Sequence, residues 1–153
     1  MINKLKITGI VKLEVFNDGK LIHSQEQQNL VVNTGLAGLA SRLNGSGAEA
    51  AFTYLAMGVG TAAAAGADTT LETEITDSGL ERGAATASRV TTTVANDTAQ
   101  LALSFSVTGS KAVTECGALN AGAAGTLLGR QVFAAVNVVS GNILAITYKF
   151  VIS

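Results

Sequence analysis

The stretch Leu5–Lys20, LKITGIVKLEVFNDGK, carries the pattern that decides the fold. Over residues 5–15 every second residue is apolar or glycine, and lysine, threonine and glutamate fill most of the positions between them. A period of two over this length indicates a strand with one buried face. Asp18-Gly19 then supplies the two positive-φ positions of a tight hairpin turn. We therefore predict a hairpin whose return strand runs over Lys20–Val32.

The hydrophobic period changes after this hairpin. Apolar residues recur at i, i+3, i+4 and i+7, which is the stripe of an amphipathic helix. The stripe consists of Leu36, Leu39, Ala40 and Leu43. Asn33 or Thr34 can cap the start of the helix with a side-chain oxygen, and Asn44-Gly45 can end it in the left-handed conformation. We expect a short helix over 33–45 that covers the β-sheet body with this stripe.

Strand signals fill the rest of the chain. Turn signals separate the apolar segments every ~8–12 residues, which is typical of antiparallel folds. The segments are Phe52–Val59, Arg89–Val94, Gln100–Val107, Val113–Leu119, Leu127–Val136 and Ile143–Ile152. The chain lacks the strand–helix alternation of a doubly wound parallel sheet. The sequence thus predicts one all-β domain over 1–153, with an antiparallel, jelly-roll-like β-sandwich over 52–153, a hairpin arm over 1–32 and one short α-helix.

Composition narrows the classes of function. The chain has 153 residues, of which 48% are hydrophobic and 14% charged, whereas an average protein carries about 25% charged residues. Ten basic and eleven acidic residues give a net charge of −1, which argues against a nucleic-acid partner and against a polybasic membrane-surface protein. A single His and a single Cys exclude a zinc cluster and an intrachain disulfide. So apolar a chain is expected to form an oligomer.

His23 and Cys116 are the residues to consider for nucleophilic catalysis. His23 stands among glutamines on the return strand of the hairpin, and we interpret it as a solvated surface residue. Cys116 lies inside a predicted strand with no histidine near it in sequence, and free cysteine is among the most buried residue types. We therefore predict no catalytic residue and no enzyme activity.

Gly58–Ala63, GVGTAA, formally matches a dinucleotide-binding pattern. That pattern needs a helix to begin there with its N-terminus facing the pyrophosphate. A glycine- and alanine-rich loop follows instead, so we interpret the segment as a tight exit from a buried strand. We expect neither a cofactor nor a small-molecule substrate.

Acidic residues gather in the next segment, Asp68–Glu81. They are Asp68, Glu72, Glu74, Asp77 and Glu81. Such carboxylates could bind Ca²⁺ or catalyse glycoside hydrolysis. The segment lacks the EF-hand spacing and aromatic residues, so we interpret it as a solvated loop and expect no metal. Thr69 and Glu72 have the spacing of a capping box, which predicts one helical turn here.

Glu115 and Arg130 lie inside predicted strands, where a charge is costly unless it is paired. They either face each other across neighbouring strands or lie at a subunit interface. The sequence leaves both alternatives open.

Five short motifs occur in an order that resembles a known family. They are Leu30–Gly35 (LVVNTG), Tyr54–Thr61 (YLAMGVGT), Asp68–Glu74 (DTTLETE), Thr114–Asn120 (TECGALN) and Leu127–Arg130 (LLGR). This order resembles the small structural proteins of tailed bacteriophages and prophages, and the likeness runs from Leu5 to Ser153. Cys116 stands where alanine is expected in many relatives. No catalytic residue carries over from this resemblance.

The resemblance implies a capsid decoration or cement protein, made in the cytoplasm of the bacterial host and located in the virion. It would bind the major capsid protein on the outer capsid surface as a symmetric oligomer, with a trimer favoured, and the hairpin arm could add strands to a neighbour. The alternative within this family is a tail, baseplate or fibre component that could contact host glycan. A third hypothesis, a small hydrolase or carbohydrate-binding module that uses the acidic loop, is weakest because only 5% of the residues are aromatic.

Overall fold

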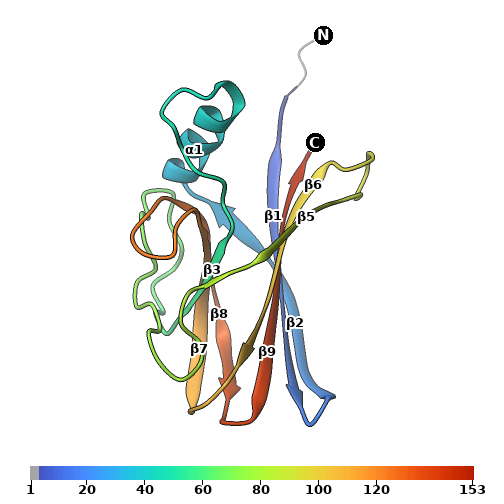
Figure 1. The fold of residues 1–153 in the computed structure, drawn as a ribbon, viewed down its shortest axis with the longest axis vertical. Helices are drawn as coiled ribbons and strands as arrows, with labels where there is room; N and C mark the ends of the chain where they lie inside the picture. Colours follow the sequence, from blue (N-terminus) through green and yellow to red (C-terminus); the bar gives the residue numbers. More distant parts are fainter. Residues whose placement is uncertain (1–3) are drawn as a thin grey trace.

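The computed structural model describes residues 4–153, so residues 1–3 of the expected arm lie outside the described residues. Its strands form one sheet in the order β4-β3-β7-β8-β2-β1-β9-β6-β5 (Figure 1). The strands are β1 (Ile7–Asn17), β2 (Lys20–Val31), β3 (Tyr54–Gly58), β4 (Gly83–Ala84), β5 (Thr86–Val90), β6 (Thr98–Ser106), β7 (Lys111–Leu119), β8 (Leu127–Val138) and β9 (Asn142–Ile152). Every strand pairing is antiparallel, which confirms the predicted all-β antiparallel class.

The sheet is nearly closed because two segments pass from one group of strands to the other. β2 pairs with β1 as far as Asn29 and with β8 from Leu30 onward. On the opposite side β4 pairs with β3 and β5 pairs with β6, and Ala85 alone separates β4 from β5. The observed architecture is therefore a nearly closed nine-stranded sheet, and the jelly-roll-like sandwich stays a prediction.

The N-terminal hairpin belongs to this sheet. Asp18 and Gly19 have φ angles of 48° and 74°, as the predicted turn requires. β1 pairs with β9 along its whole length, from Ile7 to Asn17, and its inward side chains are fully buried. A projecting arm over 1–32 was expected, but the same alternation that gives β1 a buried face makes it an inner strand of the sheet. The buried side chains are Val11, Leu13 and Val15.

The helix α1 (Asn33–Asn44) lies at one end of the sheet, the end at which β1 begins and β9 ends (Figure 1). Gly45 ends it with a φ of 71°, as predicted. The predicted cap is wrong: Val32 is the N-cap residue, and no side chain caps the helix. Thr34 instead donates from Oγ1 to the Leu127 carbonyl oxygen at 3.0 Å, which fastens the first turn to β8. With twelve residues α1 is too short to span a membrane, and no other helix within residues 4–153 could do so.

The buried face of α1 differs from the predicted stripe. Leu36 and Leu43 are 49% and 82% exposed, whereas the buried residues of the helix are Gly35 and Gly38. A Cβ at Gly35 would lie 2.1 Å from the Leu128 carbonyl oxygen, so the helix backbone itself approaches β8. Of the predicted stripe, Leu39 packs against the core. Hydrophobic periodicity cannot reveal a contact made by residues that have no side chain.

The strand predicted over Arg89–Val94 ends at Val90. The reason is Asp97, whose carboxylate accepts the backbone N–H groups of Thr92, Thr93 and Val94 at 2.7–2.9 Å. These hydrogen bonds replace the ladder that a longer strand would make, and they lower the pKa of the Asp97 carboxyl. The predicted turn at Asn96 is confirmed by its φ of 61°.

Gly35→Ala tests the close contact between α1 and β8. In an ordinary helix this change stabilises a protein by about 0.5–1 kcal/mol. Here the added Cβ must push the helix off Leu128, so we expect a loss of about 1–3 kcal/mol in the free energy of unfolding. Urea denaturation measures it, with Leu43→Ala on the exposed face of α1 as the control, expected within about 0.5 kcal/mol of wild type. A more stable Gly35→Ala protein would contradict the contact.

Candidate functional site

Glu115 on β7 and Arg130 on β8 form a buried ion pair. Their exposed fractions are 0% and 2%, and Arg130 Nε donates to Glu115 Oε2 at 2.8 Å. Gly117 stands opposite Arg130 in the β7–β8 ladder, and the space beside it is filled by Leu71 and Leu127. Of the two alternatives left open by the sequence, pairing across neighbouring strands is the one found.

Three backbone N–H groups complete the contacts of the Glu115 carboxylate. Oε1 accepts from Gly60 at 3.0 Å and from Thr73 at 2.7 Å. Oε2 accepts from Glu72 at 3.1 Å in addition to Arg130. One carboxylate thus holds both ends of the segment 60–73 against β7. With four donors directed at it, Glu115 is fully hydrogen-bonded and offers no free base.

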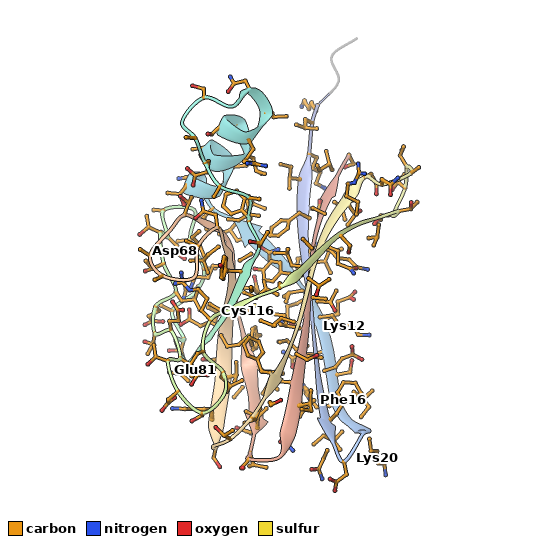
Figure 2. The ribbon with its side chains drawn as sticks, in the orientation of Figure 1. Lys12, Phe16, Lys20, Asp68, Glu81 and Cys116 are labelled. Carbon is orange, nitrogen blue, oxygen red and sulfur yellow. The ribbon has the colours of Figure 1, made fainter. Side chains whose placement is uncertain are left out.

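Arg130 holds the middle of the same segment. Nη1 donates to Asp68 Oδ2 at 2.8 Å, and Nη2 donates to the Ala62 carbonyl oxygen at 3.0 Å. Glu72 Oε2 lies 3.7 Å from Nη2 and accepts the Ala62 N–H at 2.7 Å. Figure 2 shows Asp68 among the loops that flank the sheet, next to β7 and β8. We call this set, Asp68, Glu72, Glu115 and Arg130, the loop latch.

The glycines of the GVGTAA segment make room for the latch. A Cβ at Gly58 or at Gly60 would lie 2.4 Å or 2.5 Å from Glu115 Oε1. No helix begins after them within the described residues. The interpretation of Gly58–Ala63 as a tight exit from a buried strand is therefore confirmed, since β3 ends at Gly58 and no helix follows it within the described residues.

The groups of the loop latch shift the pKa values of Asp68 and Arg130. The backbone N–H of Ala65 and then the guanidinium of Arg130 lower the pKa of the Asp68 carboxyl, against the opposing effect of burial. Burial works against the charged form of Arg130, but its hydrogen bonds with Asp68 and Glu115 outweigh burial and raise the pKa of the guanidinium. Both groups are therefore held in their charged forms at neutral pH.

Two of the other acidic residues of Asp68–Glu81 also pair with cationic side chains. Glu74 accepts two hydrogen bonds from Arg82, at 2.8 Å and 2.6 Å. Asp77 pairs with Lys111 at 2.7 Å, and Glu81 is exposed. The helical turn predicted at 68–72 is wrong, because Asp68 and Glu72 bond to Ala65 and Ala62, which precede them. Within residues 4–153 no three His, Cys, Asp or Glu side chains are grouped so that they could hold a metal ion.

His23 and Cys116 have different environments in the structure. His23 is exposed on β2, and its Nε2 lies 2.9 Å from Gln25 Oε1. Cys116 is a free, buried cysteine, and burial raises the pKa of its thiol (Figure 2). A buried neutral thiol is a poor nucleophile. The structure does not bring these two residues together. This agrees with the sequence, in which no histidine lies near Cys116.

All five motifs of the resemblance meet around the loop latch. Tyr54–Thr61 pairs with Thr114–Asn120 through β3 and β7, and Leu127–Arg130 lies on the other side of β7. Asp68–Glu74 is bound by Glu115 and Arg130, and Leu30–Gly35 joins β8 at Arg130 and Leu127. Comparisons with family models, with curated proteins and with solved structures found no match to this chain.

Breaking the latch from one side should leave a buried charge without its partner. Arg130→Met removes the countercharge of the buried Glu115 carboxylate, and we expect it to lower the free energy of unfolding by about 3–5 kcal/mol. Glu115→Gln leaves Arg130 paired with Asp68, so we expect a smaller loss. The double variant should lose less than the sum of the two, because neither charge then remains unpaired. Urea denaturation measures all three.

Glu14→Gln is the matched control, since Glu14 pairs with Lys12 at 3.3 Å on the surface. It should change the free energy of unfolding by less than about 1 kcal/mol. Single latch variants as stable as this control would show that the ion pair does not hold the loops.

The latch also predicts a dependence on acid. Because the pKa of Asp68 is lower in the folded protein than in the unfolded chain, its stabilisation is complete above about pH 5 and is lost as the pH falls through the folded pKa. Asp68→Asn should therefore flatten the fall in the free energy of unfolding below about pH 5. Urea denaturation at a series of pH values tests this, and an unchanged slope in Asp68→Asn would contradict it.

Proposed function

We propose that this protein is a structural protein of a tailed-phage virion, a capsid decoration or cement protein that binds the major capsid protein on the outer surface and stabilises the shell. In this proposal it works without catalysis, as a symmetric oligomer, for which the resemblance implies a trimer. The observation that carries the proposal is the convergence of all five motifs on the loop latch. The residues that carry the resemblance build one hydrogen-bonded unit that holds loops in place.

A rigid loop surface suits a protein that acts by contact. The segment Ala62–Ala67 consists of alanine and glycine, most of it is exposed, and the latch fixes it at Ala62, Ala65 and Asp68. Alanine loses no side-chain conformational entropy when a partner covers it. A loop already held in one conformation also avoids most of the ordering cost of association. The loop surface is therefore prepared for close packing of subunits.

The body behind these loops also suits this function. β2 and the β4–β5 segment pass between two groups of strands, and this supports the jelly-roll-like sandwich as the finer description of the fold. The core continues through both groups, from Val15 on β1 to Met57 on β3. Such a body can bear load across a particle surface, because its strands are tied together in a nearly closed sheet.

The test is reconstitution on matching capsids that lack this protein. Purified protein is incubated with these capsids, which are then sedimented and imaged by electron cryo-microscopy. We expect saturable binding at regular lattice positions and a capsid that withstands higher temperature. Density at the tail alone would instead favour a tail, baseplate or fibre component. Binding to neither structure would overturn the proposal. The hairpin cannot be deleted for this test, because β1 supplies Val11, Leu13 and Val15 to the core.

A further inference from the structure

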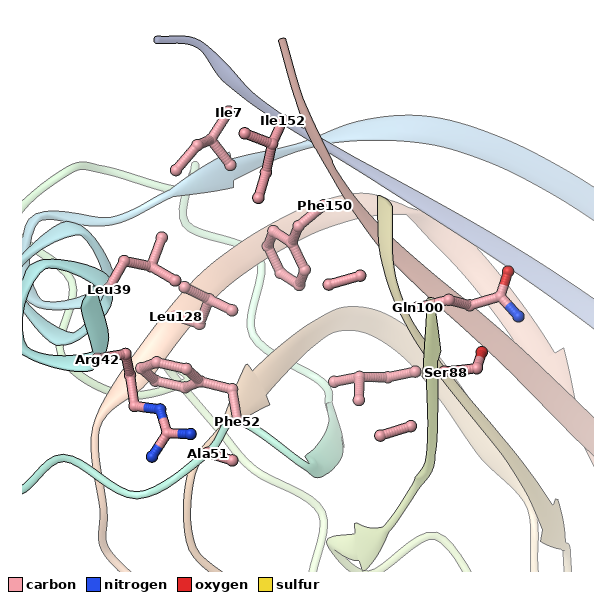
Figure 3. Close-up of a pocket in the computed structure, with 13 residues that line it drawn as sticks. Ile7, Leu39, Arg42, Ala51, Phe52, Ser88, Gln100, Leu128, Phe150 and Ile152 are labelled. Carbon is pink, nitrogen blue, oxygen red and sulfur yellow. The ribbon is translucent and has the colours of Figure 1, made fainter. Parts of the chain in front are cut away.

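An apolar pocket opens at the end of the sheet that carries α1 (Figure 3). Its volume is about 220 Å³, and its wall is formed by α1, the segment before β3 and the strands β1, β5, β6, β8 and β9. The lining side chains are mainly apolar and include Leu39, Phe52, Leu101, Leu128 and Phe150. We call it the helix-end pocket.

The size and lining of this pocket define what fits in it. An engineered apolar cavity of about 150 Å³ stays dry and binds benzene. The helix-end pocket is larger, so it has room for a side chain of the size of leucine or phenylalanine. Water gains little inside, because the wall offers it few hydrogen-bonding groups. An apolar group would therefore displace only weakly held water.

Arg42 places a positive charge on the rim of this pocket. Figure 3 shows its side chain beside Phe52. Within residues 4–153, Arg42 makes one hydrogen bond, from Nη1 to the Glu49 carbonyl oxygen at 3.1 Å, and no carboxylate lies within 4 Å of its guanidinium. The nearby Glu49 carboxylate accepts a hydrogen bond from Asn120 at 2.7 Å. The guanidinium is therefore available to a carboxylate that comes from outside the chain.

Apolar side chains continue from the pocket onto the surface. Ile152, which lines the pocket, is 45% exposed, and Leu43 follows Arg42 on the exposed side of α1. Exposed apolar area around an apolar pocket is typical of a contact with another protein. Arginine and a buried anchor side chain are also the usual centres of binding energy at such contacts.

We propose that the helix-end pocket anchors a leucine- or phenylalanine-sized side chain of the neighbouring capsid protein, next to an acidic residue that pairs with Arg42. This inference rests on the proposed function and names the chemistry of the partner segment. The apolar wall selects the anchor, and the unpaired guanidinium selects the acidic neighbour. The rigid alanine loops beside the latch remain free for contacts between copies of the protein.

Two variants remove one part of this site each. Ala99 lines the pocket on β6, so Ala99→Trp fills it, and Arg42→Glu reverses the charge on its rim. The matched controls are Ala102→Trp, on the same strand but outside the pocket, and Arg89→Glu, an exposed arginine on β5 that does not line it. Thermal unfolding of each variant identifies any that fails to fold.

Sedimentation with matching capsids gives the affinity of each protein. We expect at least a tenfold loss for Ala99→Trp and for Arg42→Glu, because anchors of this kind contribute more than about 1.4 kcal/mol. The two controls should bind within about threefold of wild type. Octanoate, which carries both an apolar chain and a carboxylate, should shift the methyl NMR signals of Leu39 and Leu128 in wild type and not in Ala99→Trp.

The outcomes separate this inference from the proposed function. If wild type binds capsids and Ala99→Trp binds equally well, the anchor is wrong while the decoration role stands. If Ala99→Trp instead changes the mass of the protein in solution, measured by light scattering, the occupant is a second copy of this chain and the inference is again wrong. If wild type does not bind capsids, both proposals fall.

Discussion

The buried carboxylate of Glu115 is the constraint on which the rest of this structure depends. A charge removed from water must be fully hydrogen-bonded or it destabilises the fold by several kcal/mol. Four donors meet this demand, and they come from β8 and from both ends of the loop over 60–73. The same demand explains the glycines at 58 and 60, since a side chain at either position would collide with the carboxylate.

The loop latch holds the long loop between β3 and β4 in place, as strand pairing would hold a strand. Between β3 and β4 the chain runs from residue 59 to residue 82 with one isolated bridge, Gly58 to Glu74, and no regular element. Loops of this length without secondary structure are uncommon in compact domains. Here the charges on Glu115, Arg130 and Arg82 take the place of a backbone ladder, and they fasten the loop at several points along its length. The polar contacts inside the loop therefore also fix the residues that the loop presents at the protein surface.

Local signals in the sequence were sufficient for some features and not for others. The hairpin turn at Asp18-Gly19 and the end of α1 at Gly45 could be predicted, because each depends on the φ angles of one or two residues. The pairing of Glu115 could be suspected from a charge inside a strand. The pairing of Arg130 with Asp68 could not, since the two residues lie 62 positions apart in the sequence and only the folded sheet brings them together. The face of α1 and the helix-end pocket depend in the same way on which strands approach the helix.

The pairing of β1 with β9 has a consequence for how the protein folds. Ile7 stands opposite Ile152, so the first described strand finds its partner only when the last one is present. Contacts between residues so far apart in sequence close large loops and slow the folding of β proteins. During synthesis the apolar face of β1 stays exposed until β9 has been made. Exposed strands of this kind are prone to aggregate. The polar β2, already joined to β1 by its tight turn, is the one neighbour that can cover an edge of β1 during that time.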